Sequence, residues 1–401
     1  MSKHELHSSP DALRRALLTG SASAGVMAFL PSAWAQGAPR PLPAYASFKD
    51  AGAMIVHSSN TLETRRAAMG GTITPLSQLY VRNNLNPPDA SVVANPDVWQ
   101  VEVSGVRRPR SFTVGELKKM GVETVAMVLQ CSGNGRGFIP SKPSGTPWQV
   151  GAAGCVMWTG VPLRNVAKAL GGVNRQAKYI TGTGGEVLPA GVDIKTRVER
   201  SVPVSALEDA LLAWEINGQP IPLAHGGPLR LIVPGYNGVN NVKYLKLLAF
   251  TEEQSDSNIQ QTNYRMTPVN EKSYRASDPA VWEMQPKSFV TAPLPEQGTL
   301  RAGRARIEGV AFGGMHAVAK VEVSTDGGAS WVPARLVGPD LGRFAWRRFE
   351  ADVDLPAGSR TITSRMTDVK GTVQDEHRIE NKGGYVNSSW RDHAVTVTVA
   401  A

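Results

Sequence analysis

The 401-residue chain lacks several features that would mark other classes of protein. It has two cysteines, Cys131 and Cys155, which excludes a disulfide-rich scaffold. It has no C-x-x-C-H pattern, so we expect no covalently attached c-type haem and no haem in this chain. Beyond the first 35 residues no segment approaches about 18 uninterrupted apolar residues, so we expect no membrane span after signal removal.

Charge and composition exclude further classes. The net charge is +9, but no Lys/Arg block or interleaved aromatic stripe is present, so we expect no nucleic-acid partner. With 41% hydrophobic and 19% charged residues, the chain is globular rather than disordered. The basic excess is compatible with an acidic partner protein or an anionic substrate.

The first 35 residues are predicted to be an export signal. Arg14 and Arg15 precede an apolar run over residues 16–30, and Ala33-Trp-Ala35 is a suitable cleavage site. The arginine pair indicates the twin-arginine route, which carries folded proteins; general secretion with an accidental pair is the alternative. We therefore expect a periplasmic protein, in which residues 36–50 form an extended N-terminal arm.

Two segments are predicted to be helical. One runs from Pro162 to Leu170 and is followed by Gly171-Gly172. The other starts at the capping box Ser205–Glu208, continues to residue 215 and ends at Asn217-Gly218. Short strands surround them, including residues 125–129, 229–233 and 244–250. This mixture predicts a mixed α/β domain over residues 51–275.

The C-terminal part is predicted to be all-β. After a polar connection over residues 252–299, about seven short strands follow in roughly 100 residues, a spacing typical of an immunoglobulin-like sandwich. The Asp326-Gly327 pair between alternating runs predicts a hairpin. We therefore expect an α+β chain whose second domain covers residues 285–401.

Residues 128–136, Val-Leu-Gln-Cys-Ser-Gly-Asn-Gly-Arg, carry the most specific chemistry. A buried strand delivers Cys131 into a tight glycine-rich turn, with the guanidinium of Arg136 close by. A thiolate suits a soft metal, and a guanidinium suits an oxyanion. Two other interpretations are open: an ordinary strand and turn with a buried cysteine, or a Cys131–Cys155 disulfide.

Three more segments place polar groups in turns. Arg82-Asn83-Asn84 follows an apolar run. A glycine-rich stretch over residues 225–243 contains groups suited to phosphate, and Tyr264 lies in the polar connection with a hydroxyl that can exchange a proton. The polar residues of the glycine-rich stretch are His225, Arg230, Asn240 and Lys243.

Together the Cys131–Arg136 turn, Arg82-Asn83, His225-Gly-Gly-Pro-Leu-Arg230 and Tyr264 resemble the sulfite oxidase family of molybdenum enzymes. The resemblance covers the chain from about residue 45 to its end and is strongest to bacterial periplasmic sulfite dehydrogenases. It implies one molybdopterin-bound molybdenum per chain, with Cys131 as the metal ligand. It also implies a substrate pocket formed by Arg82, Arg136, Trp148 and Tyr264. The implied contacts to the cofactor's phosphate or pterin are Asn83, His225, Arg230, Asn240 and Lys243.

The chain departs from the family pattern at Asn84, where many relatives have histidine. Lys382 lies near the place of a further family cation, with a loose local match. The implied reaction is oxidation of sulfite to sulfate, with electrons passed to a periplasmic c-type cytochrome. The C-terminal sandwich implies a homodimer.

Other functions remain open at this point. One is a different reaction on the same cofactor, either sulfane-sulfur oxidation or sulfoxide reduction. The other is a cofactor-free, exported, β-rich binding protein with the Cys131–Cys155 disulfide.

Overall fold

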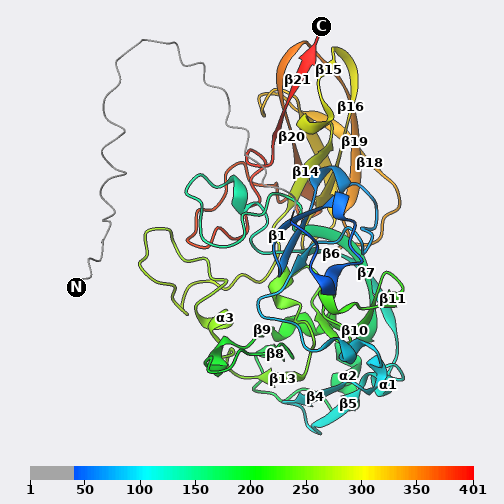
Figure 1. Cartoon of the computed structure of the whole chain (residues 1–401), viewed down its shortest axis with the longest axis vertical. Coiled ribbons are helices and arrows are strands. Elements are labelled where there is room, and N and C mark those ends of the chain that lie inside the picture. The colour runs from blue at the N-terminus through cyan, green and yellow to red at the C-terminus, as the bar shows by residue number, and fades with distance from the viewer. Residues whose placement is uncertain (1–39) are drawn as a thin grey trace, which may run out of the picture. The chain divides into compact units, whose positions relative to one another are not determined.

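Short strands dominate the computed structural model, which describes residues 40–401 (Figure 1). The predicted export signal and the first residues of the predicted arm therefore lie outside the described residues. The α-helices of the described part are short: α1 (Val114–Leu117), α2 (Leu163–Ala169) and α3 (Asn258–Gln261). None of the helices in residues 40–401 is long and apolar enough to cross a membrane.

A small antiparallel sheet follows the N-terminal arm and leads to Arg82. It consists of β1 (Met54–Ser58), β2 (Thr61–Thr64) and β3 (Val81–Arg82), in that order. Leu62 of β2 pairs with Val81 of β3, and both are buried, so the apolar contact fixes the register. As a result Arg82 lies at the end of a strand whose preceding residue is anchored in the core.

The second sheet carries the cysteine turn. Its strands are β6 (Glu123–Gln130), β7 (Ala153–Pro162), β10 (Leu211–Ile216), β11 (Gln219–Pro220) and β12 (Arg230–Ile232). The strand predicted over residues 125–129 is confirmed as part of β6. β6 and β7 run antiparallel with Val128 opposite Cys155, and β6 ends directly before Cys131.

The third sheet packs against the apolar cluster with the most buried residues in the first of the two predicted domains. Its strand order is β5 (Arg110–Thr113), β4 (Gln100–Ser104), β13 (Leu247–Thr251), β8 (Tyr179–Thr183) and β9 (Glu199–Pro203). β13 runs parallel to β4 and antiparallel to β8. Buried Val101, Ile180 and Leu248 join side chains of α1 and α2 in this cluster.

The helix predicted over residues 205–215 is wrong. A 3-10 turn covers Val204–Glu208, and strand β10 follows at Leu211–Ile216. Asn217 and Gly218 have φ values of 52° and 74°, so they form a hairpin turn between β10 and β11 instead of ending a helix. Residues 211–214 are all buried, and a continuous apolar run of this kind also suits a central strand.

One further predicted helix and two further predicted strands are present in the structure. The helix predicted from Pro162 is confirmed as α2, and Gly171 and Gly172 adopt positive φ just after it. β12 confirms the strand at residues 229–233. The strand predicted over residues 244–250 begins later, at Leu247, because Tyr244 adopts a left-handed conformation with φ of 50°.

The C-terminal part is rich in strands, as predicted. In hydrogen-bonded order its strands are β14 (Lys287–Ala292), β16 (Gly303–Phe312), β19 (Arg347–Leu355), β18 (Val332–Val337), β17 (Val318–Ser324), β20 (Gly358–Asp368), β21 (Val395–Ala400) and β15 (Leu300–Arg301). β17 and β18 form the hairpin predicted around Asp326-Gly327. Side chains such as Ile307, Val321 and Phe349 fill one apolar cluster here.

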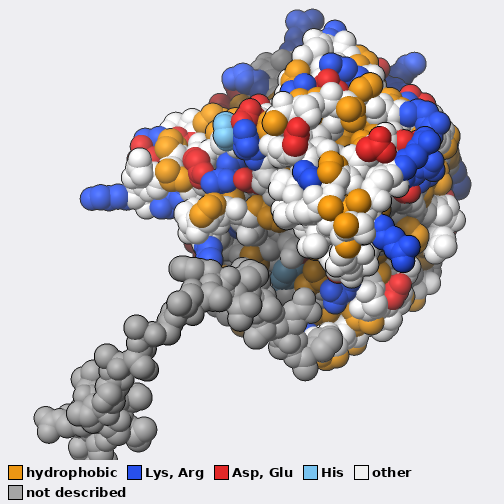
Figure 2. Space-filling model, turned by 90° about the horizontal axis from the view of Figure 1, so that it is seen from above, with side chains coloured by type: hydrophobic (Ala, Val, Ile, Leu, Met, Phe, Trp, Pro, Cys, Tyr) orange, Lys and Arg blue, Asp and Glu red, His pale blue; other side chains and the backbone are white. Residues whose placement is uncertain are grey.

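Figure 2 shows the surface from one side. Lys and Arg side chains on this face are interspersed with acidic and apolar ones. The excess basic charge on this face is therefore not gathered into the single stripe that nucleic-acid binding favours.

Gly160 allows the close contact between β7 and β10. An added Cβ would lie 2.2 Å from the backbone oxygen of Leu212. We predict that Gly160→Ala lowers the free energy of unfolding by about 1–3 kcal/mol, because the two strands must move apart. Urea unfolding measures this loss.

The matched control is Gly115→Ala in α1, where the nearest atom would be 3.5 Å from the new Cβ. It should leave stability unchanged or raise it slightly, because alanine favours helix. Equal stability of the two variants would contradict the packing described for the β7–β10 contact.

Candidate active site

Cys131 begins a tight turn at the end of β6. Its amide donates to Ala152 O (2.9 Å), and its carbonyl accepts from the amide of Asn134 (2.9 Å). Gly135 takes a φ of 95°, which lets the chain turn toward Arg136. The Cys131 side chain is a free thiol and is 8% exposed, so it is held in place yet reaches a cavity.

Residues from both the N-terminal and the C-terminal half of the chain form hydrogen bonds that hold this turn. The Asn134 side chain donates to Gln130 Oε1 (3.1 Å) and accepts from the amide of Ala152 (3.1 Å). From the C-terminal half, the buried Lys287 ammonium donates to Asn134 O (3.3 Å) and Asn387 O (2.8 Å). The position of Cys131 therefore depends on residues more than 150 positions away.

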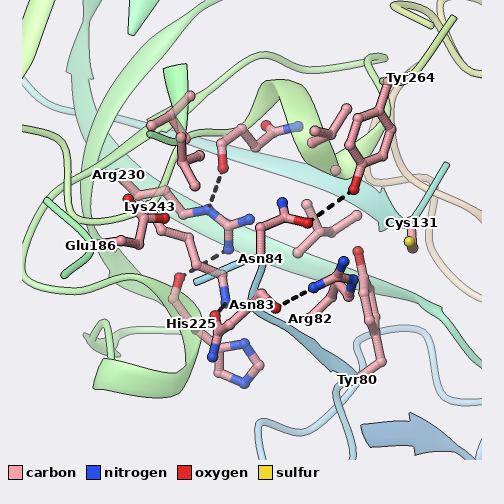
Figure 3. A pocket seen from close by; sticks show the side chains of 16 residues that line it. Tyr80, Arg82, Asn83, Asn84, Cys131, Glu186, His225, Arg230, Lys243 and Tyr264 are labelled. Atoms are coloured by element: carbon pink, nitrogen blue, oxygen red, sulfur yellow. Dashed lines mark hydrogen bonds between the residues drawn. The ribbon is translucent and has the colours of Figure 1, made fainter. Parts of the chain in front are cut away.

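Two pockets meet at Cys131. Figure 3 shows the inner pocket, with Cys131 and Glu186 on opposite sides, Arg230 and Lys243 beside Glu186, and Arg82 toward Cys131 and Tyr80. The outer pocket is a cavity of about 350 Å³. Side chains lining both pockets are Arg82, Asn84, Cys131 and Tyr264. Lining only the inner pocket are, among others, Tyr80, Asn83, Glu186, His225, Arg230, Asn241 and Lys243. Lining only the outer pocket are, among others, Arg136, Trp148, Tyr274 and Tyr385.

Basic side chains dominate the inner pocket. Arg230 donates to His225 O (2.9 Å) and Asn241 O (3.0 Å), and Lys243 donates to Ala224 O (2.6 Å) and Asn83 Oδ1 (2.5 Å). These partners are uncharged. Burial lowers the pKa of Arg230 to about 10. Burial together with cationic neighbours pushes the pKa values of Lys243 and His225 well below their usual range. The empty pocket thus disfavours the charged forms of these side chains, and an anionic ligand would favour them.

Glu186 is the acidic residue among those lining the inner pocket. Its Oε2 is buried without a hydrogen-bond partner. Burial raises the pKa of Glu186 to about 7, although Lys243 and Arg230 act in the opposite direction. This single carboxyl does not balance the charge of the basic side chains that line the inner pocket. Its unpartnered oxygen is instead placed to bind N–H groups of a ligand.

Arg136 and Arg82 bring two guanidinium groups to the outer pocket. Arg136 donates to Gly383 O (2.8 Å) and Thr146 O (3.1 Å), and its guanidinium lies over the Tyr385 ring at 5.2 Å. An added Cβ at Gly133 would lie 2.7 Å from this guanidinium. Glycine at position 133 therefore makes room for the cation beside Cys131.

Tyr264 lines both pockets and carries a polar hydroxyl. Its hydroxyl donates to Asn84 Oδ1 (3.2 Å), so Asn84, where many relatives have histidine, is the hydrogen-bond partner of the tyrosine. The Tyr264 ring stacks on Tyr385 at 5.1 Å. Trp148 is fully buried, lines the outer pocket and contacts Tyr80 edge to face at 6.2 Å.

The structure brings together nearly all of the residues predicted from the sequence. Asn240 is the exception, because it lines neither pocket. Its Oδ1 accepts from Arg200 (3.0 and 3.3 Å), and its Nδ2 donates to Val281 O and Trp282 O (both 3.1 Å). This buried position does not support the predicted contact of Asn240 with the cofactor and gives it a structural role.

Other predictions concern residues outside the pockets. Lys382 donates to Glu271 O (3.0 Å) and lies outside the lining of both pockets. The Cys131–Cys155 disulfide is absent: both thiols are free, and burial raises the pKa of Cys155 to about 12. Sequence reasoning missed Glu186, which lies in a Gly-Gly-Glu loop with no recognisable signature, and Lys49, which lies in the arm.

Comparisons with known proteins identify the domains of this chain. Residues 88–259 match the oxidoreductase molybdopterin binding domain, and residues 278–399 match the Mo-co oxidoreductase dimerisation domain. Sulfite oxidase of Gallus gallus is 31% identical over 79% of this chain and 72% of that protein. Inducible nitrate reductase [NADH] 1 of Glycine max is 32% identical over 80% of this chain. The chain spans 39% of the length of that nitrate reductase.

A solved structure shows the same fold. The sulfane dehydrogenase SoxCD from Paracoccus pantotrophus superposes with a TM-score of 0.72, covering 98% of this chain and 100% of that chain at 23% identity. At this identity the likeness concerns the fold alone.

The two matching family models define a molybdopterin-dependent oxidoreductase. The chain belongs to the sulfite oxidase family of molybdenum enzymes. Its cofactor is molybdopterin-bound molybdenum, and the pockets fit that group. Cys131 offers a thiolate to a soft metal, and the buried cations of the inner pocket suit a phosphate.

The unpartnered carboxyl of Glu186 makes stability depend on pH. A carboxyl whose pKa rises from 4.5 to about 7 on folding holds its proton more tightly in the folded state. It therefore destabilises the cofactor-free protein progressively as the pH rises from about 4.5 to about 7. We predict that Glu186→Gln removes this part of the pH dependence, so the variant gains stability over the wild type at pH above about 7.

Thermal or urea unfolding of both proteins across this pH range measures the difference. Curves that stay parallel would show that Glu186 titrates as an ordinary exposed carboxyl.

Proposed function

We propose that this protein oxidises sulfite to sulfate at its molybdenum centre and passes the electrons to a periplasmic c-type cytochrome. The observation that carries the proposal is the position of Cys131 at the junction of a cationic inner pocket and an outer pocket containing two guanidinium groups. The inner pocket suits the cofactor, and the outer pocket suits a small oxyanion.

The cofactor would be held at both of its ends. Cys131 would ligate the metal, and His225, Arg230 and Lys243 would face the phosphate. Glu186 would accept N–H groups from the aminopyrimidinone ring of the pterin. When bound, the molybdenum centre supplies oxygen-atom transfer and takes up the electron pair from the substrate.

Arg82 and Arg136 would bind the substrate. Sulfite and water together give sulfate, two protons and two electrons, so both substrate and product are oxyanions. Guanidinium groups bind oxyanions through paired, charge-assisted hydrogen bonds. Arg136 is fixed for this role by Gly383 and Thr146, which orient its fork before substrate arrives.

Tyr264 and Trp148 would shape the reaction space. The Tyr264 hydroxyl lies on both pockets and already donates to Asn84, so it can hold or pass a proton while water is consumed. The buried Trp148 ring closes one wall and keeps bulk water from that side.

Several parts of the proposal concern the cellular setting. The predicted signal with its arginine pair supports export to the periplasm by the twin-arginine route; it lies outside the described residues. The match of residues 278–399 to a dimerisation domain supports a homodimer formed by an immunoglobulin-like C-terminal domain. The sulfite oxidase relatives support sulfite as the substrate.

Nitrate reduction is a second candidate. The nitrate reductase of Glycine max is 32% identical to this chain, and a pair of guanidinium groups binds either oxyanion. Each purified preparation should therefore be assayed in two ways, for sulfite-dependent reduction of cytochrome c and for nitrate-dependent oxidation of a reduced dye. Turnover with nitrate and none with sulfite would overturn the sulfite proposal.

Cys131→Ser tests the metal ligand. We predict that the variant folds but loses nearly all turnover, because the hydroxyl is a poor ligand for a soft metal. Molybdenum analysis and sulfite-dependent cytochrome c reduction measure the effect. The matched control is Cys155→Ala, whose residue lies on β7 and outside both pockets; it should retain molybdenum and turnover. Wild-type activity in Cys131→Ser would end the assignment.

Arg82→Met tests the oxyanion contact. Losing a charge-assisted hydrogen bond costs about 1.5–3 kcal/mol, so kcat/KM for sulfite should fall about 10- to 100-fold per bound molybdenum. Part of the loss should appear as a higher KM. The control is Arg175→Met, at an exposed position outside both pockets. An unchanged kcat/KM in Arg82→Met would remove Arg82 from substrate binding.

A further inference from the structure

Lys49 is a buried lysine of the N-terminal arm whose ammonium contacts a residue in the wall of the inner pocket. Its side chain is 5% exposed. Its ammonium contacts three acceptors: Leu76 O, Leu79 O at 2.7 Å, and Nε2 of His225 at 2.7 Å. Since His225 lines the inner pocket, Lys49 touches the pocket wall without lining the pocket itself.

The hydrogen-bond count around Lys49 determines the state of His225. Both carbonyl oxygens can only accept, so each takes one N–H from the lysine. An ammonium has three N–H groups, and the third points to Nε2 of His225. When Lys49 is charged, Nε2 accepts this N–H and is the ring nitrogen without a proton, so Nδ1 carries it. Among the described residues Nδ1 has no hydrogen-bond partner, and the ring lines the inner pocket.

The surroundings of Lys49 disfavour its charge unless an anion is nearby. All three partners of its ammonium are uncharged, and burial lowers the pKa of Lys49 to about 7. Lys49 and Lys243 both lower the pKa of His225, which keeps the imidazole neutral. A buried positive charge without a counterion is costly, and an anion in the inner pocket would reduce that cost.

The rest of the arm supports the same arrangement. The ring of Phe48 packs edge to face on His225 at 6.2 Å. The hydroxyl of Tyr45 accepts from Asn83 Nδ2 at 3.4 Å. Three residues of one short segment therefore contact two residues that line the inner pocket, so the arm forms an outer layer of its wall.

We propose that Lys49 is a positioning residue for the cofactor: it holds His225 in the tautomer that carries its proton on Nδ1, so that the ring donates a hydrogen bond to the phosphate of molybdopterin. The inference rests on the proposed role of His225 as a phosphate contact. Groups that orient a ligand in this way commonly change affinity about 10- to 100-fold when removed.

Lys49→Met is the test variant, because methionine has a similar length and no donor. In the loaded wild-type protein, nitrogen-15 NMR of the His225 ring should show the proton on Nδ1. In Lys49→Met the signal should shift toward the other tautomer or a mixture. The chain has seven histidines, so the His225 signal is assigned by its loss in His225→Asn.

Cofactor retention provides the second measurement. The pterin released from each purified protein is oxidised and quantified by fluorescence, before and after dialysis. We expect Lys49→Met to lose cofactor about 10- to 100-fold more readily than the wild type. The control Lys178→Met, whose lysine is 62% exposed, should retain it fully.

Two conservative variants separate the possible failures. The amide nitrogen of asparagine lies near the place of Nδ1, and that of glutamine near Nε2. His225→Asn should therefore retain more cofactor than His225→Gln. Normal retention in both would refute the phosphate role of His225. Impaired retention in His225→Gln together with an unchanged tautomer and normal retention in Lys49→Met would refute the role of Lys49 alone.

Discussion

The site depends on an excess of buried positive charge beside a single thiol. Arg230 and Lys49 are buried and Lys243 is half-buried, all with hydrogen-bond partners that are uncharged, and Glu186 alone cannot balance them. Such an arrangement is unfavourable in the empty protein and becomes favourable when a strongly anionic ligand enters. The fold holds these cations in place through backbone oxygens: Lys49 donates to Leu79 O, Arg230 to His225 O and Lys243 to Ala224 O.

Cys131 adds a metal ligand to this anion site. Its turn is held by β6 and β7 on one side and by Lys287 of β14 on the other, so metal ligation and the C-terminal half are mechanically linked. Arg136 shows the same linkage, since its guanidinium is fixed by Gly383. A structural change in the C-terminal half would therefore alter the outer pocket, although none of the described strands of that half lines it.

Much of this could be predicted from the sequence, and the failures have physical causes. The strand before Cys131 and the stretch from His225 to Lys243 were predictable because each adjoins a glycine-rich turn with few conformations, whereas the roles of Arg82 and Tyr264 came from the resemblance to the family. The run Leu211-Leu-Ala-Trp-Glu-Ile was misread as helix because a continuous apolar run does not distinguish a helix from a central strand. Asn240 was misplaced because a polar side chain in such a loop can satisfy a buried arginine, here Arg200, instead of a ligand. Glu186 and Lys49 have no local signal, since only the folded chain brings them to His225 and Lys243.

The central claim is that Cys131 binds the molybdenum of the cofactor held by the cationic pocket. The most direct measurement is X-ray absorption at the molybdenum edge, comparing the wild type with Cys131→Ser loaded with the same cofactor. The account predicts a thiolate sulfur beside the dithiolene sulfurs in the wild type and its loss in the variant. The same sulfur shell in both proteins would contradict it.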